Sequence, residues 1–380
     1  MPWGGVAHSF PVATAGAALL LLCATLAGCN GLDGDTSSTS SQSFPSSTGI
    51  STGISTAPPL PDFDGDAALE FVRGFVLQAD GTPRFRIPGT VGQQEGAAYL
   101  WSQTDLPGWT RGWQNFTGED YLLLNRSVVA GYGQGSLPCS LKAEAVPALP
   151  FHNLYALRAA GGAYPEPPLL LLAAHWDSQM HSDFDPDESK RCLPDPGAND
   201  GASGVGLLLQ MMRELEGVDL PFRVGVLFID GEDGFFDHYP LAGALYFAQN
   251  PPFGVDRFLL LDMVGDPGAR YIREAASAQS DPKMLDLLWR HGRALGGGDS
   301  FVQRSYSITD DHVAFIAAGI PSVDVIDAGR DATGFPPQWD TTEDTVEKLS
   351  PTMLALVGDT ILATVQDPTF VQGWPGLSGP

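Results

Sequence analysis

The apolar positions of this chain follow two different spacings from residue 62 onward. Continuous apolar runs, typical of strands, occupy 121–124, 128–130, 154–157, 169–174, 223–229, 257–262 and 322–326. Between them apolar positions recur at helical spacing, and the predicted helices cover 67–77, 93–103, 202–215, 241–249, 282–295, 311–318 and 350–366. Alternating strands and helices favour a parallel sheet covered on both faces. The pattern therefore predicts an α/β fold, with a single three-layer α/β/α domain over residues 62–380 and a central mixed, mostly parallel sheet.

The first 61 residues have a different pattern. An apolar stretch from Ala15 to Leu26 leads into Leu26-Ala27-Gly28-Cys29, which resembles the lipobox of bacterial lipoproteins. The resemblance implies a signal peptide over residues 1–28 and lipidation of Cys29; an ordinary secretory signal is the alternative. Residues 29–61 are mostly Ser, Thr, Gly and Pro, which predicts a disordered tether. We therefore expect a protein of the bacterial cell envelope, periplasmic or outer-surface, that contacts the membrane only through a lipid anchor.

The charge of the chain limits its partners. Its 45 acidic and 20 basic residues give a formal net charge of -25. Nucleic acid is excluded as a partner because phosphate binding needs Lys and Arg clusters, and anionic lipid surfaces would be repelled. We interpret the acidity as a solvated surface outside the cytoplasm, with a preference for cationic or neutral ligands as the alternative.

The cysteines also bear on the compartment. Cys139 and Cys192 are the two in the predicted globular part. In an oxidising compartment they could form a disulfide, or they could be two separate buried thiols. No C-x-x-C spacing occurs, so we do not expect cysteine to ligate a metal.

Five short segments carry the chemistry. They are His175-Trp176-Asp177, Asp200, Glu232-Asp233, Asp262 and Trp339-Asp340. Three of them follow or end the apolar runs LLLLAA, FRVGVLFI and FLLL, and open α/β sheets build their sites at such strand ends. Histidine and carboxylates are ligands that zinc accepts. Taken singly, Asp177 could cap a loop, and Asp200 or Ser203 could cap a helix. The ordered occurrence of all five predicts a shared metal site.

A second acidic group lies in the loop after the run at 169–174. Its members are Asp183, Asp185, Asp187 and Glu188. Such a cluster is of a kind that calcium favours, but acidic clusters are more often simply solvated, and we interpret this one as solvated.

Longer motifs connect the five segments to a known family. HWDS, GANDGASG, LFIDGEDGF, LLLDMVG, TDDHVAFIAAGIP and PPQWDTTEDTVEKLS together resemble glutaminyl-peptide cyclotransferase, within the zinc aminopeptidase superfamily. The likeness runs from residue 62 to about 365 and includes an early RIPGT. It implies a metal-dependent acyltransferase that converts N-terminal glutaminyl residues of peptides to pyroglutamyl residues and releases ammonia. It further implies one Zn²⁺ ion, peptide or protein N-termini as partners, and a monomer.

The resemblance also implies roles for individual residues. The metal ligands are Asp200, Asp233 and Asp340, and Glu232 is the catalytic acid/base. Two further catalytic carboxylates are Asp262 and Asp311, and the residues at substrate-binding positions are Trp339, His238 and Asp324.

Four of these positions depart from the family pattern. Asp233 stands where the family usually has glutamate, and Asp340 where it has histidine. Asp324 replaces a second histidine, and His238 replaces a tryptophan of the substrate pocket. Three aspartates make a harder, more anionic site, which favours calcium, magnesium or manganese and would weaken zinc as a Lewis acid.

Two other functions use the same residues. A two-metal aminopeptidase would bind one ion at His175, Asp200 and Asp262 and another at Asp200, Asp233 and Asp340. In a cyclotransferase, His175 and Asp177 would instead support the ligands or the structure. A lipoprotein that kept the fold, lost the metal and binds peptides is the third alternative. His181, His238, His291 and His312 are expected at the surface or on helices, although His181 or His238 could replace the missing ligand from a loop.

Overall fold

The computed structural model describes residues 62–124, 139, 143–159, 166–233, 241–330, 334–374 and 377. Several sequence-based predictions lie outside these ranges. They are the signal peptide, Cys29, the tether, the strand at 128–130, and His238. Within the described ranges, no helix is long and apolar enough to cross a membrane.

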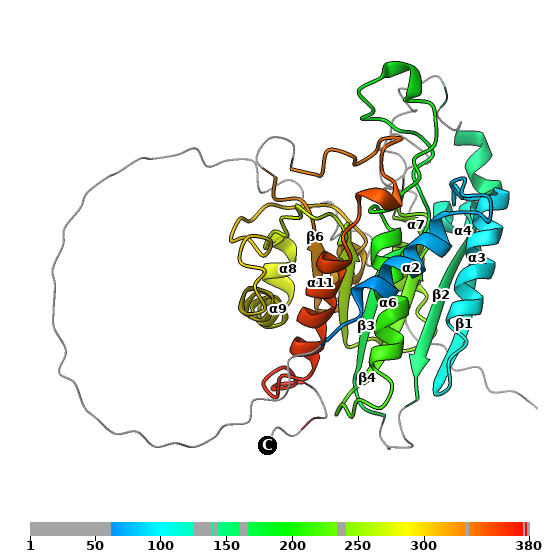
Figure 1. Ribbon diagram of the computed structural model, residues 1–380. Coiled ribbons are helices and arrows are strands. Elements are labelled where there is room, and N and C mark those ends of the chain that lie inside the picture. Colours follow the sequence, from blue (N-terminus) through cyan, green and yellow to red (C-terminus); the bar gives the residue numbers. More distant parts are fainter. Residues whose placement is uncertain are drawn as a thin grey trace, which may run out of the picture. The chain divides into compact units, whose positions relative to one another are not determined.

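A six-stranded sheet forms the middle of the fold (Figure 1). Its order is β1 (Trp109–Thr117), β2 (Pro150–Arg158), β4 (Arg223–Ile229), β3 (Leu169–His175), β5 (Arg257–Asp262) and β6 (Ser322–Ile326). Strands β4, β3, β5 and β6 pair in parallel, whereas β1 and β2 add an antiparallel edge. The parallel strands are almost wholly buried, which explains their continuous apolar runs.

Helices cover both faces of the sheet. Alternate residues of β3 enter different cores: Leu170 and Leu172 pack with one cluster, and Leu171 and Ala173 with the other. The first core is covered by α2 (Gly65–Val76), α6 (Ala202–Glu214), α9 (Pro282–Ala294) and α11 (Pro351–Val365) (Figure 1). The second is covered by α4 (Gly118–Leu124), α7 (Ala242–Gln249) and α10 (His312–Ala317). The predicted α/β fold, with its mostly parallel sheet between two helical layers, is confirmed.

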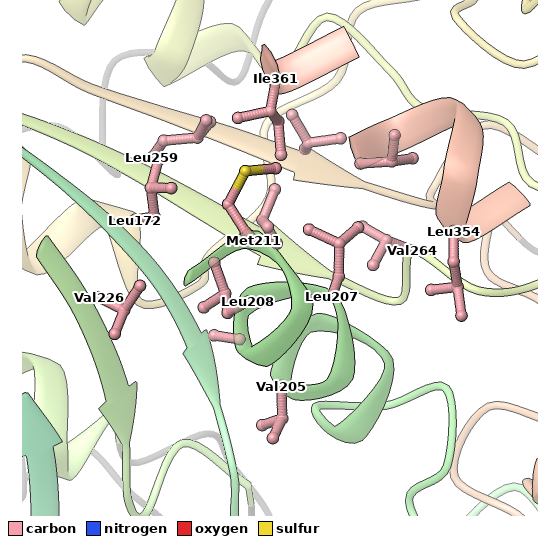
Figure 2. Close-up of a cluster of buried hydrophobic side chains, with 14 of the residues drawn as sticks. Leu172, Val205, Leu207, Leu208, Met211, Val226, Leu259, Val264, Leu354 and Ile361 are labelled. Carbon is pink, nitrogen blue, oxygen red and sulfur yellow. The ribbon is translucent and has the colours of Figure 1, made fainter. Parts of the chain in front are cut away.

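Helix α6 carries the largest share of the first core (Figure 2). Eleven of its thirteen residues are buried, because β3 lies on one side and α2 and α11 lie on others. Leu208 and Met211 face the sheet residues Leu172 and Leu259 (Figure 2). Burying such a side chain contributes about 1.5–3 kcal/mol. Since the site residue Asp200 precedes α6 directly, this packing also fixes one part of the site.

The predicted strand at 121–124 is wrong, because these residues end α4. Thr117 and Asp120 cap each other: Asp120 Oδ2 accepts from the Thr117 N–H at 2.9 Å, and Thr117 Oγ1 accepts from the Asp120 N–H at 3.3 Å. This reciprocal cap favours a helix over the apolar run that follows. The sequence pattern also did not predict β1, whose residues are mostly half-buried or exposed, the short helix α8 (Ala275–Ser280), or three 3₁₀ turns.

The remaining predicted elements match the structure to within a few residues. Helix α3 spans Val91–Gln103, and the 3₁₀ turns span Ala143–Ala148, Glu188–Lys190 and Val346–Lys348. A disulfide joins Cys139 to Cys192, with their Cα atoms 5.8 Å apart, so the two cysteines are paired and not separate thiols. The bridge connects the loop after β3 to residue 139 and closes a loop of 53 residues.

Candidate metal centre and active site

The candidate site lies where the parallel strands end. His175 is the last residue of β3 and pairs in register with Ile229, the last residue of β4, which Glu232 and Asp233 follow shortly. Asp262 is the last residue of β5. Because these strands run in parallel, their carboxyl ends share one edge of the sheet, and the polar residues meet there.

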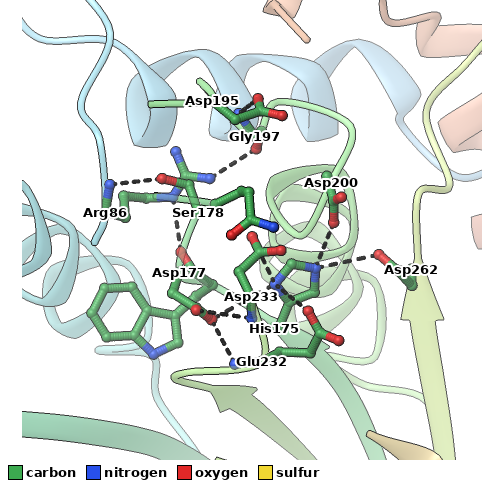
Figure 3. Close-up of polar contacts among 12 residues, drawn as sticks. Arg86, His175, Asp177, Ser178, Asp195, Gly197, Asp200, Glu232, Asp233 and Asp262 are labelled. Carbon is green, nitrogen blue, oxygen red and sulfur yellow. Dashed lines mark hydrogen bonds and ion pairs between the residues drawn. The ribbon is translucent and has the colours of Figure 1, made fainter. Parts of the chain in front are cut away.

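The His175 ring lies at the centre of the acidic groups (Figure 3). Its Nε2 atom is 2.9 Å from Asp200 Oδ1 and 3.3 Å from Asp262 Oδ1. Its Nδ1 atom is 3.7 Å from Asp177 Oδ1, 4.0 Å from Glu232 Oε2 and 3.9 Å from Asp233 Oδ2. Burial acts to lower the pKa of His175, but the neighbouring carboxylates outweigh it and raise this pKa well above its usual value. When no metal ion is bound, the imidazolium is therefore the main positive charge of the centre.

Three aspartates next to His175 form a group that can hold a cation. One carboxylate oxygen from each of Asp200, Asp233 and Asp340 lies within 4.8 Å of the other two. All three residues are buried, and among the described residues Asp233 Oδ2 and Asp340 Oδ1 have no hydrogen-bond partner. Buried carboxylates are costly unless a cation or donors compensate them. A divalent ion fits this donor set, because it would supply the compensation that these oxygens lack.

Further groups share members with the first. His175, Asp200 and Asp262 lie within the same 4.8 Å limit, as do His175, Glu232 and Asp233. Asp200 could therefore bridge two ions. Burial, together with the charges around them, raises the pKa of Glu232 and Asp233 well above the usual value and that of Asp262 to about 7.

Two other carboxylates hold the loops that carry the site. Asp344 accepts from the N–H groups of Asn199 and Asp200 at 3.0 Å. Asp177 accepts from the N–H groups of Glu232 at 3.2 Å and Asp233 at 3.1 Å. The alternative in which Asp177 caps a loop thus describes its observed contacts.

The helix-capping alternative for Asp200 is not what the structure shows. The N-cap of α6 is Gly201, with no side-chain hydrogen bond to the helix. Ser203 Oγ instead donates to the carbonyl of Asn199 at 2.6 Å and accepts from the Val264 N–H. Gly201 has a φ of +72°, and a Cβ atom there would lie 2.6 Å from His175 Cε1. Only glycine permits this approach of the loop to the histidine.

Asp340 and Trp339 come from the turn near 340. Asp340 has a φ of +51°, which Asp tolerates better than most residues, and its carbonyl accepts from the Phe184 N–H at 3.0 Å. The Trp339 ring stacks on Phe184 at 4.7 Å between centroids and contacts Phe335 at 4.2 Å. Phe184 is 59% exposed, so this aromatic group is accessible from solvent.

The other predicted site residues lie deeper. Asp311 is fully buried, and neither of its oxygens has a hydrogen-bond partner in the part of the chain that the structure describes. Asp324 is fully buried on β6, beside His312. His181 is also buried, and its Nε2 atom lies 3.1 Å from the Cys139 carbonyl, outside the cation-binding groups formed by the described residues. The expectation of a surface or helical position is therefore wrong for His181, whereas His312 begins helix α10 and His291 lies on α9 and is partly exposed.

The acidic loop after β3 binds its own backbone. Asp185 is buried and accepts from the Thr342 N–H at 3.1 Å and from Thr342 Oγ1 at 2.6 Å. Asp187 caps the short turn at 188–190 through Ser189. Asp185 is thus structural, and the interpretation of this group as solvated is wrong for Asp185.

Much of the chain, including the site residues from His175 to Asp340, matches a known protein family. Residues 155–365 match the family model of peptidase family M28. The chain belongs to this family. A glutaminyl-peptide cyclotransferase-like protein of Bos taurus is 28% identical over 237 residues, which is 53% of this chain and 57% of the relative. The chain thus spans little more than half the length of that relative.

Solved structures resemble the M28 chain over a larger share. A Zn-dependent exopeptidase from Parabacteroides distasonis is 30% identical, with a TM-score of 0.67, over 81% of this chain and 99% of that one. A glutaminyl cyclase from Porphyromonas gingivalis is 29% identical, with a TM-score of 0.66, over the same shares. The predicted resemblance to glutaminyl cyclases within the zinc exopeptidase superfamily is confirmed.

Arg86 of the RIPGT motif was not predicted to be a site residue of this M28 protein. Arg86 is fully buried, and its guanidinium donates to the carbonyls of Trp176, Pro196 and Gly197 at 2.8–2.9 Å (Figure 3). Burial lowers its pKa to about 10, so it stays charged at neutral pH. Arg86 therefore joins the loop that carries Asp177 to the loop that leads to Asp200.

Proposed function

We propose that this M28 protein is a metal-dependent glutaminyl-peptide cyclotransferase. It would convert an N-terminal glutaminyl residue of a peptide or protein to a pyroglutamyl residue and release ammonia. One observation carries the proposal: the buried Glu232 carboxyl lies directly beside a group of three aspartates suited to one cation. The similarity to glutaminyl cyclases supports it.

The proposed ligands are Asp200, Asp233 and Asp340, and the proposed ion is Zn²⁺. When bound there, the ion would act as a Lewis acid toward the γ-carbonyl of the substrate glutamine. Three carboxylates make the site more anionic than one that contains a histidine. They would bind manganese or magnesium more readily than a mixed site does.

Glu232 is the proposed proton carrier. Burial, opposed by the His175 charge and reinforced by Asp233, raises the pKa of Glu232 well above its usual value. A carboxyl group whose pKa is raised in this way is better suited to take and return a proton than one with the ordinary pKa. In the reaction the α-amine nitrogen bonds to the carbonyl carbon of the γ-carboxamide, and the bond from that carbon to the amide nitrogen breaks. Glu232 takes a proton from the α-amine and returns it to the departing nitrogen, which leaves as ammonia.

Neighbouring groups would place the substrate. Asp262 and Asp311 are buried carboxyls that can accept from the substrate amine. Neither oxygen of Asp311 accepts from a described residue, and Asp262 Oδ1 lies 3.3 Å from His175 Nε2. Trp339, stacked on Phe184, supplies an aromatic wall for the substrate. Asp324 is fully buried beside His312, which argues against a direct contact between this residue and a peptide.

Ammonia release tests the proposal. A peptide that begins with glutamine is incubated with the purified protein, and ammonia and peptide mass are measured before and after chelation. We expect chelator-sensitive ammonia release without chain cleavage, and its loss in Glu232→Gln. The matched control is Glu188→Gln, an exposed carboxylate of the same size, which should keep the activity. Turnover that survives Glu232→Gln would contradict the assigned role.

Aminopeptidase activity is the second candidate. His175 with Asp200 and Asp262 forms a second group that shares Asp200 with the first, as a two-ion site requires, and one similar structure is described as a Zn-dependent exopeptidase. Glu232 would then activate water for attack on a peptide bond. Two ions at the groups that share Asp200, together with release of the first residue of the peptide, would favour this activity over cyclisation. A chain that binds no divalent ion would instead favour the third alternative, a lipoprotein that binds peptides without catalysis.

We also propose that Cys29 carries a lipid that anchors the protein in the cell envelope. The Leu26-Ala27-Gly28-Cys29 segment and the Ser/Thr/Gly/Pro-rich sequence after it support this placement. Labelling of cells with a fatty acid probe should mark the unaltered protein and not Cys29→Ser. Equal labelling of both would contradict the proposal.

A further inference from the structure

A second group of possible ligands lies apart from the three aspartates. Asp310, His312 and Asp324 each offer one ligand atom, and these atoms lie within 4.8 Å of one another. The residues come from the start of α10 and from β6, and none is more than 3% exposed. No member belongs to the groups around Asp200.

Glu274 sets the tautomer of the His312 ring. Its carboxylate accepts from the N–H groups of Ala276 at 2.9 Å and Ser277 at 2.6 Å, at the start of α8. His312 Nε2 lies 3.1 Å from Glu274 Oε2. Since a carboxylate so placed can only accept, the Nε2 atom carries the proton of a neutral ring. The Nδ1 lone pair then points to the other side. A carboxylate that holds the far nitrogen of a ligating histidine in this way is a common feature of metal sites.

The side of the ring that carries Nδ1 has no donor among the described residues. Nδ1 lies 3.6 Å from Asp324 Oδ2 and has no hydrogen-bond partner within the described ranges. In the same ranges neither oxygen of Asp324 has a partner, and Asp310 Oδ2 has none. The Asp324 N–H is bonded to Ser277 Oγ, which holds the residue in place without satisfying its carboxylate. Lone pairs that face one another at such burial repel unless a cation lies between them.

We propose that Asp310, His312 and Asp324 bind a divalent first-row metal ion, such as Mn²⁺ or Zn²⁺. One imidazole nitrogen and two carboxylates suit such ions better than calcium, which prefers six to eight oxygen ligands. The ion offsets the charges of Asp310 and Asp324, and Glu274 orients the histidine. Asp324 is the residue that stands where the resembling family has a second histidine. The exchange replaces a neutral side chain by an anionic one.

The bound ion has a structural role. It joins the start of α10 to β6, and through Glu274 to α8, so it fixes the backbone that carries Asp311. The proposal does not depend on the proposed cyclotransferase activity, because it concerns ligands that the three-aspartate group does not share.

Anomalous scattering tests the proposal on the unaltered protein. Crystals are soaked in MnCl₂, and anomalous difference maps are calculated at a wavelength where manganese scatters. We expect a peak between Asp310, His312 and Asp324. Absence of a peak there overturns the proposal, whether or not manganese occupies the three-aspartate group.

Metal content of variants provides a second measurement. After loading with Mn²⁺ and removal of free ion, Asp324→Asn should hold one ion fewer per chain than the unaltered protein. The matched control is Asp230→Asn, which removes an equally buried carboxylate outside all of these groups and should keep the full content. Equal metal content in Asp324→Asn and the unaltered protein would also overturn the proposal.

Discussion

Replacing Arg86 tests whether the site loops depend on one buried side chain. Its guanidinium makes three hydrogen bonds of 2.8–2.9 Å to buried carbonyls. The Cζ atom of Arg86 also lies 4.9 Å from the centroid of the Phe75 ring. Arg86→Met removes the charge and leaves those carbonyls without donors. Arg86→Lys keeps a charge but cannot reach three carbonyls with one planar group.

The contacts allow a magnitude to be worked out. A hydrogen bond to a charged group contributes about 1.5–3 kcal/mol, but three bonds from one side chain are not additive. Removing one partner of a buried charged network typically costs about 3–5 kcal/mol, and we expect this loss for Arg86→Met. For a folded unit of about 320 residues, the change lowers the melting temperature by about 5–8 °C. We expect about half of this loss for Arg86→Lys.

Urea unfolding at pH 7 measures the effect. The control is Arg73→Met, because Arg73 is 42% exposed and only pairs with the surface residues Glu70 and Glu347. Such pairs contribute about 0–1 kcal/mol. Arg86→Met should also reduce metal affinity, since Arg86 joins the loops of Asp177 and Asp200. A stability loss below about 1 kcal/mol with unchanged metal affinity would refute the reasoning.

Three further changes have predicted outcomes. Glu274 has a pKa lowered to about 2 from an ordinary 4.5, because the His312 contact and backbone donors outweigh burial. The stabilisation from the Glu274 carboxylate is complete above pH 4.5 and is lost as the pH falls toward 2. Glu274→Gln should therefore lower the free energy of unfolding by at most about 3 kcal/mol at pH 7, and its stability should fall less steeply in acid than that of the unaltered protein. Equal slopes in acid for the two proteins would contradict this. Asp340→His should raise zinc affinity about tenfold or more in a chelator competition, because imidazole is a softer ligand; equal or weaker affinity would count against Asp340 as a ligand. Cys192→Ser opens a loop of 53 residues and should cost up to about 4 kcal/mol of unfolding free energy in oxidising buffer. Under reducing conditions the variant and the unaltered protein should have the same unfolding free energy.

The sequence predicts the central strands well because they are buried on both faces. The run at 169–174 has no polar interruption, and the strand there ends one residue later, at His175. Edge strand β1 lacks such a signal, since only Phe116 among its nine residues is buried. The helix at 118–124 was missed because a local cap, not the apolar run, decides its conformation.

Some residues of the candidate site could be predicted from the sequence and others could not. Residues at the ends of parallel strands, such as His175 and Asp262, could be brought together from the sequence because topology places strand ends at one edge. Arg86, Asp344 and Glu274 could not be assigned, because they bind backbone groups that leave no spacing in the sequence. The side chains of such positioning residues are visible only once the loops are folded.

Metal content measured together with ammonia release tests the central claim most directly. The protein is purified, its metal is quantified before and after chelation, and a glutamine-initiated peptide is supplied in each state. We predict a bound divalent ion that the chelator removes and that Asp340→Asn binds more weakly. Ammonia release should be lost when that ion is removed and regained when it is restored. Ammonia release that persists in the metal-free protein, or a fully loaded protein that releases none, would contradict it.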